Sequence, residues 1–501
     1  MLSDSAKTGM KFDSFFVGAF IIVHIGSRFL SASFEIAIHG TDWSQPAANM
    51  VATIWSTLSP NTLTIAEHVT WWLALGLILL FLPYFPYSKH AHLFMGPLNI
   101  MASEKRKSMA AIETIDFEDE ELDHDEEKEA HSDEEDHGEF KFGLILVGPR
   151  DDKGWSQAHF EGGEYVEEIT GGEMIVADFI NPADSPNLTV DQVASDMIDE
   201  GAQLIIATSD DMKDGILAAA EMYPDIPMIW ASGDSAKADG KGYREDLENL
   251  GNIMGRMEYG KMIAGCAAAL KTKTGHIGFL GPLINDETRR LTNAAYLGAK
   301  HCYKGENELK FDVIWIGFWF HIPGVTSDPT QVTNEFFDAG ADVVISHIDT
   351  PEALVVTGQR AAEGEDVYVV GYDYEFTCET APDVCLGVPY YNWGPDYLNA
   401  AMNAAHGEFE AEWIWSGPNW EDMNDKDSSA IGWQMGDGLS DTEAGELGSF
   451  MSLLASEQLN LFTGPINFQD GSVYLEDGVE ATDNEIWYTP QLLEGMLGDS
   501  E

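Results

Sequence analysis

Aromatic and acidic residues recur directly after the apolar runs that we predict to be strands. The first such run is followed by Asp151, Asp152, Trp155, Ser156 and His159. An aromatic side chain in this position can hold a flat ring, since one base–aromatic stack is worth about 1–3 kcal/mol. Similar clusters follow four later strands, at Thr208–Asp214, Gly317–Phe320, Ser346–Pro351 and Gly371–Phe376.

Three residues in these clusters suit the binding of a small solute. Trp155 and Trp319 can sandwich a flat ring, and Asp373 can accept two hydrogen bonds from vicinal hydroxyls of a sugar. Each has a structural alternative, which is core packing for the tryptophans and a helix cap or turn for Asp373. We find no nucleophile–base pair, phosphate loop or metal-ligand set beside them. The sequence therefore predicts a binding protein without enzymatic activity, metal or cofactor.

Buried strands alternating with amphipathic helices must position these residues. Two successive sets of strand and helix, each about 110 residues long, predict an α/β fold with two doubly wound parallel-sheet lobes. Ligands of such sheets bind beyond the carboxyl ends of the strands, so the two lobes should share one cleft. We expect lobe 1 at about 140–256, lobe 2 at about 257–373, and a C-terminal segment, Cys378–Glu501, that recrosses the hinge. The predicted strands are 141–148, 173–179, 203–209, 227–232, 276–281, 311–317, 342–347 and 367–372.

The composition excludes one large class of partner. Asp and Glu number 86 against 26 Lys and Arg, which gives a formal net charge of −60. Nucleic-acid binding needs clustered basic residues, so we exclude it. A heavily hydrated surface accounts for the acidity, with a surface for a cationic partner as the alternative.

The N-terminal 110 residues read as a membrane anchor. Residues 69–88 form an uncharged run long enough to span a bilayer, with aromatic residues at both ends. Residues 14–36 contain Arg28 and either form a second span or lie in the interface. A cleaved signal peptide is disfavoured, because the start of the chain is barely basic. Residues 111–139 are dominated by Asp and Glu and should form a disordered linker, or a weak cation chelator.

Six motifs occur in order from residue 140 onward, namely DDKGWSQAHFEG, GRMEYGKMIAGCAAALKTKTGHIGFLGP, GADVVISHIDTP, VVGYD, YNWGPDY and LFTGPINFQDG. Through these motifs the chain resembles the basic membrane protein family of solute-binding proteins, which includes purine nucleoside receptors of ABC importers. The resemblance covers about 360 residues and implies the type I periplasmic-binding-protein fold, closure around a ligand and an ABC permease as partner.

The resemblance also assigns roles to individual residues. Asp152 lies in a motif whose acid helps to hold the ligand, and Trp155 matches a stacking aromatic. Ser156 stands where the family has asparagine, and Asp373 matches the aspartate that binds ribose. The family commonly has lysine where this chain has Tyr391, so a free purine or another flat heterocycle stays open beside a nucleoside. The remaining candidates for the cleft are His159, Trp319, Asp349 and Trp393.

The four cysteines lie in the part of the chain that resembles this family. None forms a Cys-x-x-Cys pair, so a zinc or iron–sulfur site is not expected. Their even count fits two disulfides or four free thiols equally well. In the family's frame, Cys378 and Cys385 bracket a short loop after Asp373. Cys266 and Cys302 lie on helices that flank one strand. We therefore hypothesise two disulfides, one within each of these two pairs.

A second resemblance covers roughly residues 12–121. The stretch EHVTWWLALGLILLFLPYFPYSKHAHLFMGPLNI is similar to part of the membrane domain of heterodisulfide-reductase-like oxidoreductases, which are related to the nitrate reductase gamma subunit. That family binds b-type haem through paired histidines, and His24 and His68 would be the candidates here. The family continues into cysteine-rich cluster domains, which this chain lacks. We therefore interpret the segment as an anchor without haem, and keep a redox subunit as an alternative.

The charges flanking the apolar segments bear on orientation. Lys7 and Lys11 precede the first segment and Lys105 to Lys107 follow the second, whereas residues 37–68 contain no Lys or Arg. This pattern places both ends in the cytoplasm. We nevertheless expect the binding domain outside, because an import receptor must meet its solute there. The rival function is a ligand-sensing receptor of the same fold without transport.

Overall fold

The computed structural model describes residues 4–40, 45–84 and 140–501. The chain divides into two compact units, Met1–His131 and Ser132–Glu501. The acidic segment predicted as a linker, 111–139, lies outside the described residues.

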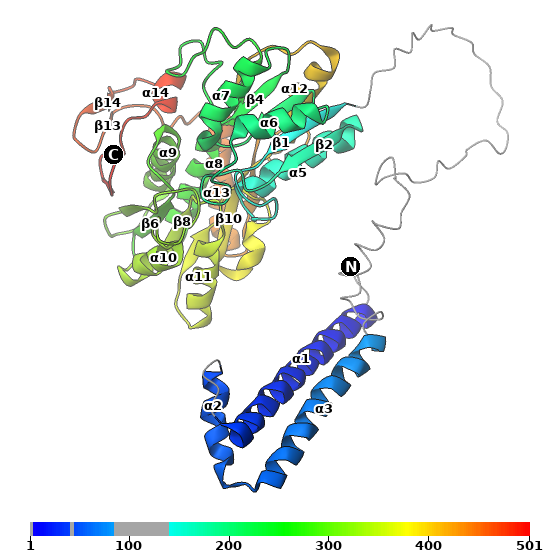
Figure 1. The fold of residues 1–501 in the computed structure, drawn as a ribbon. Coiled ribbons are helices and arrows are strands. Elements are labelled where there is room, and N and C mark those ends of the chain that lie inside the picture. Colours follow the sequence, from blue (N-terminus) through cyan, green and yellow to red (C-terminus); the bar gives the residue numbers. More distant parts are fainter. Residues whose placement is uncertain (1–3, 41–44, 85–139) are drawn as a thin grey trace, which may run out of the picture. The chain divides into compact units, whose positions relative to one another are not determined.

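The described part of the N-terminal unit is helical (Figure 1). Helix α1 (Asp4–His39) packs along α3 (Pro60–Tyr84), with α2 (Pro46–Ala52) and a 3₁₀ turn at Thr53–Thr57 between them in sequence. The Trp55 indole donates to the Ser33 hydroxyl over 3.0 Å, and its ring lies 4.9 Å from that of Phe34. The turn is thereby held against α1.

The structure does not support the two membrane spans predicted at 14–36 and 69–88. Of the helices in the described residues, none is both long and apolar enough to cross a bilayer. Residues 85–88 of the second predicted span lie outside the described part. His24 Nδ1 lies 3.1 Å from the Ala74 carbonyl oxygen, and His68 Nδ1 lies 2.8 Å from the Thr64 carbonyl oxygen. These contacts do not bring the two histidines together as a pair.

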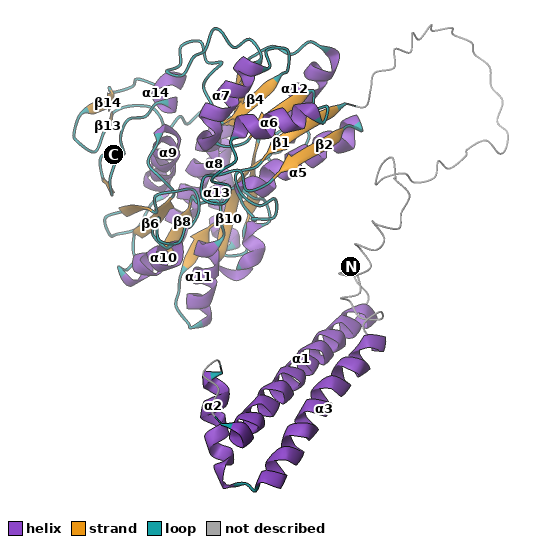
Figure 2. Ribbon diagram, in the orientation of Figure 1, coloured by secondary structure: helices purple, strands orange, loops and turns teal. Residues whose placement is uncertain are grey.

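Two parallel sheets form the C-terminal unit (Figure 2). The first has the order β11-β5-β4-β3-β1-β2 and the second β12-β10-β9-β8-β6-β7-β15, in which only the β10–β12 pairing is antiparallel. A small third sheet pairs β13 (Ile466–Asn467) with β14 (Val473–Leu475). The first sheet's strands are β1 (Lys141–Ile145), β2 (Glu173–Ala177), β3 (Leu204–Ala207), β4 (Met228–Ala231), β5 (Leu250–Gly255) and β11 (Trp413–Ser416). The second sheet's strands are β6 (His276–Gly281), β7 (Lys310–Trp315), β8 (Val343–Ser346), β9 (Tyr368–Val370), β10 (Cys385–Tyr391), β12 (Ile431–Met435) and β15 (Met496–Leu497).

The central strands are buried on both faces, as their continuous apolar runs predict. Every residue of β3, β4 and β8 is buried. Helices between the strands supply the covering layers, and their ends carry sequence-encoded caps. Asn285 and Thr288 form a capping box at the start of α9, and Ser440 and Glu443 form one at α13. The helices are α5 (Trp155–Thr170), α6 (Val190–Asp199), α7 (Lys213–Met222), α8 (Met257–Lys271), α9 (Asp286–Cys302), α10 (Pro329–Asp338), α11 (Glu352–Ala362), α12 (Gly394–His406), α13 (Asp441–Ala455) and α14 (Asp483–Trp487).

The chain passes between the two sheets three times. It leaves the first sheet after β5, returns through α12 to β11, and enters the second sheet again at β12. The segment after Cys378 thus supplies β11 to one sheet and β10, β12 and β15 to the other. Three crossovers of this kind make a hinge, because they are the covalent links between the lobes.

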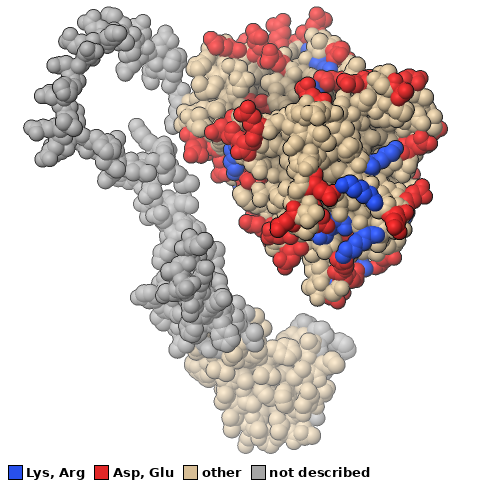
Figure 3. Space-filling view, turned by 180° about the vertical axis from the view of Figure 1, so that it is seen from behind, with Lys and Arg blue, Asp and Glu red and all other residues tan. Residues whose placement is uncertain are grey.

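Both cysteine pairings considered above are present. Cys266 on α8 is bonded to Cys302 at the end of α9, and Cys378 is bonded to Cys385 at the start of β10. The first joins two helices that pack along their lengths. The second closes the loop that follows Tyr372 and Asp373. Acidic side chains are spread over the face of this unit shown in Figure 3, with few basic ones among them.

Candidate ligand-binding site

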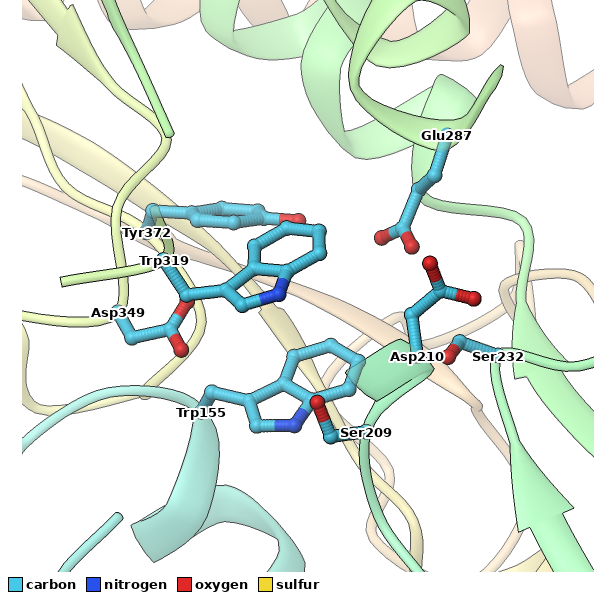
Figure 4. A pocket seen from close by; sticks show the side chains of 8 residues that line it. All are labelled: Trp155, Ser209, Asp210, Ser232, Glu287, Trp319, Asp349 and Tyr372. Carbon is cyan, nitrogen blue, oxygen red and sulfur yellow. The ribbon is translucent and has the colours of Figure 1, made fainter. Parts of the chain in front are cut away.

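A narrow cavity with about 10 Å³ of free volume lies between the two lobes of the C-terminal unit (Figure 4). Three aromatic rings, two hydroxyls and three carboxylates form its wall. These residues are Trp155, Ser209, Asp210, Ser232, Glu287, Trp319, Asp349 and Tyr372.

Each of these residues comes shortly after a parallel strand. The first sheet provides Trp155 after β1, Ser209 and Asp210 after β3, and Ser232 after β4. The second sheet provides its four residues in the same way. They are Glu287 after β6, Trp319 after β7, Asp349 after β8 and Tyr372 after β9. The carboxyl ends of both sheets therefore face one cavity, as the fold class predicts.

Asp152 shapes the turn that presents Trp155. Its carboxylate accepts hydrogen bonds from the backbone N–H groups of Gly154, Ser156 and Gln157 at 2.9–3.0 Å. Burial raises the pKa of Asp152 to about 6, against the lowering effect of these bonds. The Ser156 hydroxyl accepts a bond from the Gly148 N–H over 3.0 Å. Both residues support the turn, and neither lines the cavity.

An aromatic cluster holds Trp155 from behind. His159 stacks on Trp393 with ring centroids 4.0 Å apart, and its Nδ1 lies 2.6 Å from the Tyr397 hydroxyl. Tyr391 stacks on the other side of Trp393 at 4.9 Å. Burial holds the pKa of His159 well below its ordinary value, so the ring is neutral. We predicted His159, Tyr391 and Trp393 as ligand-binding residues, and the structure places all three behind the wall.

Two wall carboxylates have no donor from the protein. Within the described part of the chain, no group donates a hydrogen bond to Asp349 or Glu287, and neither forms an ion pair. Asp349 is only 5% exposed and Glu287 only 8% exposed. Burial raises the pKa of Asp349 well above its ordinary value and that of Glu287 to about 7. The site thus holds buried acceptors whose donors must come from elsewhere.

Asp373 lies just behind the wall, next to Tyr372. It is fully buried, and neither carboxylate oxygen has a hydrogen-bond partner among the residues described. Burial raises its pKa well above the ordinary value, although Lys261 opposes this. Lys261 is buried on α8, donates to the Ser346 carbonyl over 2.9 Å and lies 3.2 Å from the Tyr372 ring centre. This lysine therefore supports the Tyr372 side of the wall.

Backbone strain gathers at the same place. Lys153, Ser232 and Asp373 are non-glycine residues with φ of 59°, 68° and 66°. Such conformations cost about 1–3 kcal/mol each and persist where the surroundings enforce them, often at ligand sites. Lys153 precedes Trp155, Ser232 lines the cavity and Asp373 follows Tyr372.

A wider chamber of about 260 Å³ adjoins the cavity and shares Asp210, Ser232 and Glu287 with it. It is lined by charges of both signs, including Lys213, Lys241 and Arg290. Because the two spaces share these three residues, they lie side by side, and we name the wider one the approach chamber.

The sequence analysis found part of this wall. Trp155, Trp319 and Asp349 line the cavity as their strand-end positions suggest, whereas Asp373 lies one residue behind. Reasoning from the sequence missed five wall residues and one supporting residue. Ser209 and Asp210 lay in a cluster already noted after the third strand, and Tyr372 adjoins Asp373. The others missed were Ser232, Glu287 and Lys261.

Comparison with solved structures and curated proteins supports the fold. A solute-binding protein of an ABC transporter from Aeropyrum pernix matches with a TM-score of 0.52 over 70% of this chain and 96% of its own, at 12% identity. An 82-residue stretch is 39% identical to a probable iron–sulfur-binding oxidoreductase of Bacillus subtilis, but it covers only 12% of that protein. The redox resemblance is thus confined to a short segment.

Longer matches cover most of the binding unit. A purine-binding protein of Brucella abortus is 26% identical over 365 residues, which are 71% of this chain and 91% of the relative. A putative ABC transporter glucose-binding protein of Haloferax volcanii is 28% identical over 338 residues, 67% and 79% of the two chains. The Bmp family, described as PnrA-like ABC transporter substrate-binding proteins, matches residues 140–417. Together with two parallel-sheet lobes that close around one cavity, this match shows that the chain belongs to the Bmp family of ABC transporter substrate-binding proteins.

Proposed function

We propose that the protein is the receptor of an ABC importer and binds a purine nucleoside, or a closely related heterocycle, in the cavity between its lobes. The observation that carries this proposal is the composition of the wall. Trp155 from one lobe and Trp319 from the other line the same cavity as the partnerless carboxylates of Asp349 and Glu287.

The wall matches the chemistry of a nucleoside. Its three aromatic side chains offer faces for a flat base, each stack being worth about 1–3 kcal/mol. The buried carboxylates accept hydrogen bonds, and ribose hydroxyls and base N–H groups donate them. A relative that is named as purine-binding shares 26% identity over most of the binding unit, which favours the same ligand class.

The fold supplies the means of trapping the ligand. Three chain crossings form the hinge, and residues from both lobes must approach to complete the wall. Two disulfides within the binding unit suit an oxidising compartment, so we place this unit outside the cytoplasm. There it would meet the solute and deliver it to the permease.

A monosaccharide is the second candidate ligand. The relative from Haloferax volcanii is named as putatively glucose-binding, and carboxylates beside aromatic faces also suit a sugar ring. A free sugar would leave one of the two tryptophan faces without a flat partner. We therefore favour the nucleoside.

The test begins with the full-length protein purified without added ligand. Mass spectrometry of the small molecules released by denaturation should identify a purine nucleoside or a free purine. Calorimetry on the emptied protein should then show binding to nucleosides and none to glucose. Trp155→Ala should abolish binding, whereas Arg244→Met, which changes a side chain outside the cavity wall, should not. Failure of all purines and nucleosides to bind would refute the proposed ligand, and glucose binding would establish the alternative.

A further inference from the structure

Five polar groups of the cavity wall can accept hydrogen bonds. Three are carboxylates, and the two serine hydroxyls can accept as well as donate. Among the donors, the Trp155 indole N–H bonds the Thr208 carbonyl over 2.6 Å, the Tyr372 hydroxyl lies 3.4 Å from that of Tyr391, and the Trp319 indole N–H has no partner among the described residues. A ligand that pairs with the three carboxylates must therefore bring N–H or O–H donors of its own.

Glu287 stands out among these acceptors. It is 8% exposed, and its carboxylate lines both the cavity and the approach chamber. Its neighbour Asp286 has a different environment, since that carboxylate pairs with Arg289 and with Lys241. Of these two successive acids at the start of α9, Asp286 is ion-paired, whereas Glu287 points into the cavity (Figure 4).

Three nearby basic side chains form no hydrogen bond or ion pair with Glu287 in the described part of the chain. Arg290 Nε donates to Glu258 over 2.6 Å, and the guanidinium lies 4.1 Å from the Trp487 ring centre. Lys261 donates to the Ser346 carbonyl. Lys213 lies 5.7 Å from the Trp230 ring centre and forms no ion pair within the described residues. The partner that Glu287 lacks is thus not supplied by these basic side chains.

Asp210 determines what kind of donor suits Glu287. The two carboxylates come from opposite lobes and point toward one another across one side of the cavity (Figure 4). A hydroxyl carries a single proton and can satisfy one of them. An amino group carries two N–H bonds, so it can donate to both carboxylates and also relieve their mutual repulsion. Asp349, on the other side of the aromatic rings, remains free for the rest of the ligand.

We propose that Glu287, together with Asp210, binds an exocyclic amino group on the ligand ring, so that the receptor selects amino-bearing purine nucleosides over those that lack the amino group. This inference rests on the proposed function and names its specificity-determining residue. Hydrogen bonds to charged groups are worth about 1.5–3 kcal/mol, which corresponds to a preference of about tenfold or more.

Two ligand pairs isolate the amino group. Guanosine and inosine differ only in the 2-amino group, and adenosine and purine riboside differ only in the 6-amino group. Calorimetry on the full-length protein should give, for at least one pair, a Kd about tenfold lower for the amino-bearing member. Glu287→Gln should reduce that ratio by about fivefold or more, because its amide offers one weaker acceptor and a donor that opposes the amino group. Asp286→Asn is the matched control and should keep the ratio.

Asp210→Asn provides an independent variant should Glu287→Gln fail to fold, which a thermal melt with intact disulfides would reveal. A ratio that stays the same in a folded Glu287→Gln or Asp210→Asn protein overturns the inference. So does a wild-type protein that binds both members of each pair equally, an outcome that leaves the proposed function standing. Absence of binding to all four nucleosides, in contrast, refutes the proposed function itself.

Discussion

Gly154 of one lobe touches Asp349 of the other, backbone against backbone. A Cβ atom on Gly154 would lie 1.7 Å from the Asp349 carbonyl oxygen. The Lys153 carbonyl next to it accepts a hydrogen bond from the Thr377 hydroxyl over 2.9 Å, again across the lobes. The close approach of two segments of the chain therefore requires glycine here. Because these segments belong to different lobes, the structure represents the closed arrangement of the lobes.

Gly154→Ala should prevent this closure. The alanine methyl meets main-chain atoms, which cannot rotate away as a side chain can, so the lobes must stay apart. We expect ligand affinity to fall by about 100-fold or more, since a misplaced wall loses several contacts at once. Calorimetry measures the loss. Small-angle scattering should show compaction on ligand addition in wild type and none in the variant, and compaction in both would contradict the prediction.

The indole N–H of Trp155 ties the start of α5 to the end of β3. Trp155→Phe keeps an aromatic face but leaves the buried Thr208 carbonyl without this donor, which costs about 1–3 kcal/mol. Trp155→Ala also removes the stack and opens a cavity beside His159 and Trp393. Affinity should therefore fall in the order wild type, Phe, Ala. Equal affinities for wild type and Trp155→Ala would show that the ring does not touch the ligand.

Much of this architecture follows from the sequence because its signals are local. Continuous apolar runs predict buried parallel strands, and strand-end positions then place Trp155, Trp319 and Asp349 at the cleft. His159 lies one turn after Trp155 on the same face of α5. Its ring contacts Trp155 and Trp393, and its Nδ1 lies 2.6 Å from the Tyr397 hydroxyl of α12, which the sequence alone does not display.

Other features depend on contacts that the sequence does not display. The three backbone donors that hold the carboxylate of Asp152 cannot be predicted from the sequence. Nothing in the sequence separates Glu287 from Asp286, because only packing decides which acid turns inward. Lys261 lies in an otherwise apolar helix, and its use as a support for Tyr372 depends on a strand nearly 85 residues later in the chain.

The buried pair of Glu258 and Arg290 should be important for stability. Arg290 Nε donates to Glu258 over 2.6 Å. The side chain of Arg290 is 2% exposed and that of Glu258 is 6% exposed. Glu258→Met leaves the guanidinium buried without its counter-charge, so we expect a loss of about 3–5 kcal/mol in the free energy of unfolding. Urea unfolding measures it. Arg244→Met, which breaks pairs with Glu221 and Asp246 at the surface, is the control and should cost at most about 1 kcal/mol.

Glu287 should make the stability of the ligand-free protein depend on pH. Burial raises its pKa from 4.5 to about 7, with Asp210 and Glu258 adding to the effect and Arg290 opposing it. The folded protein therefore binds a proton more tightly than the unfolded chain, and stability falls as pH rises from 4.5 to 7. Glu287→Gln removes this cost.

The free energy of unfolding of Glu287→Gln should exceed that of wild type by about 3 kcal/mol above pH 7. The difference should become small as the pH falls to 4.5, where the glutamate is protonated in the folded protein and half protonated in the unfolded chain. The buried His159 and His347 titrate in both proteins, so their contribution cancels in the comparison. Urea unfolding of both proteins at pH 4.5, 6 and 8 without ligand provides the measurement. A difference that is the same at all three values would show that the pKa of Glu287 is the same in the folded and unfolded protein.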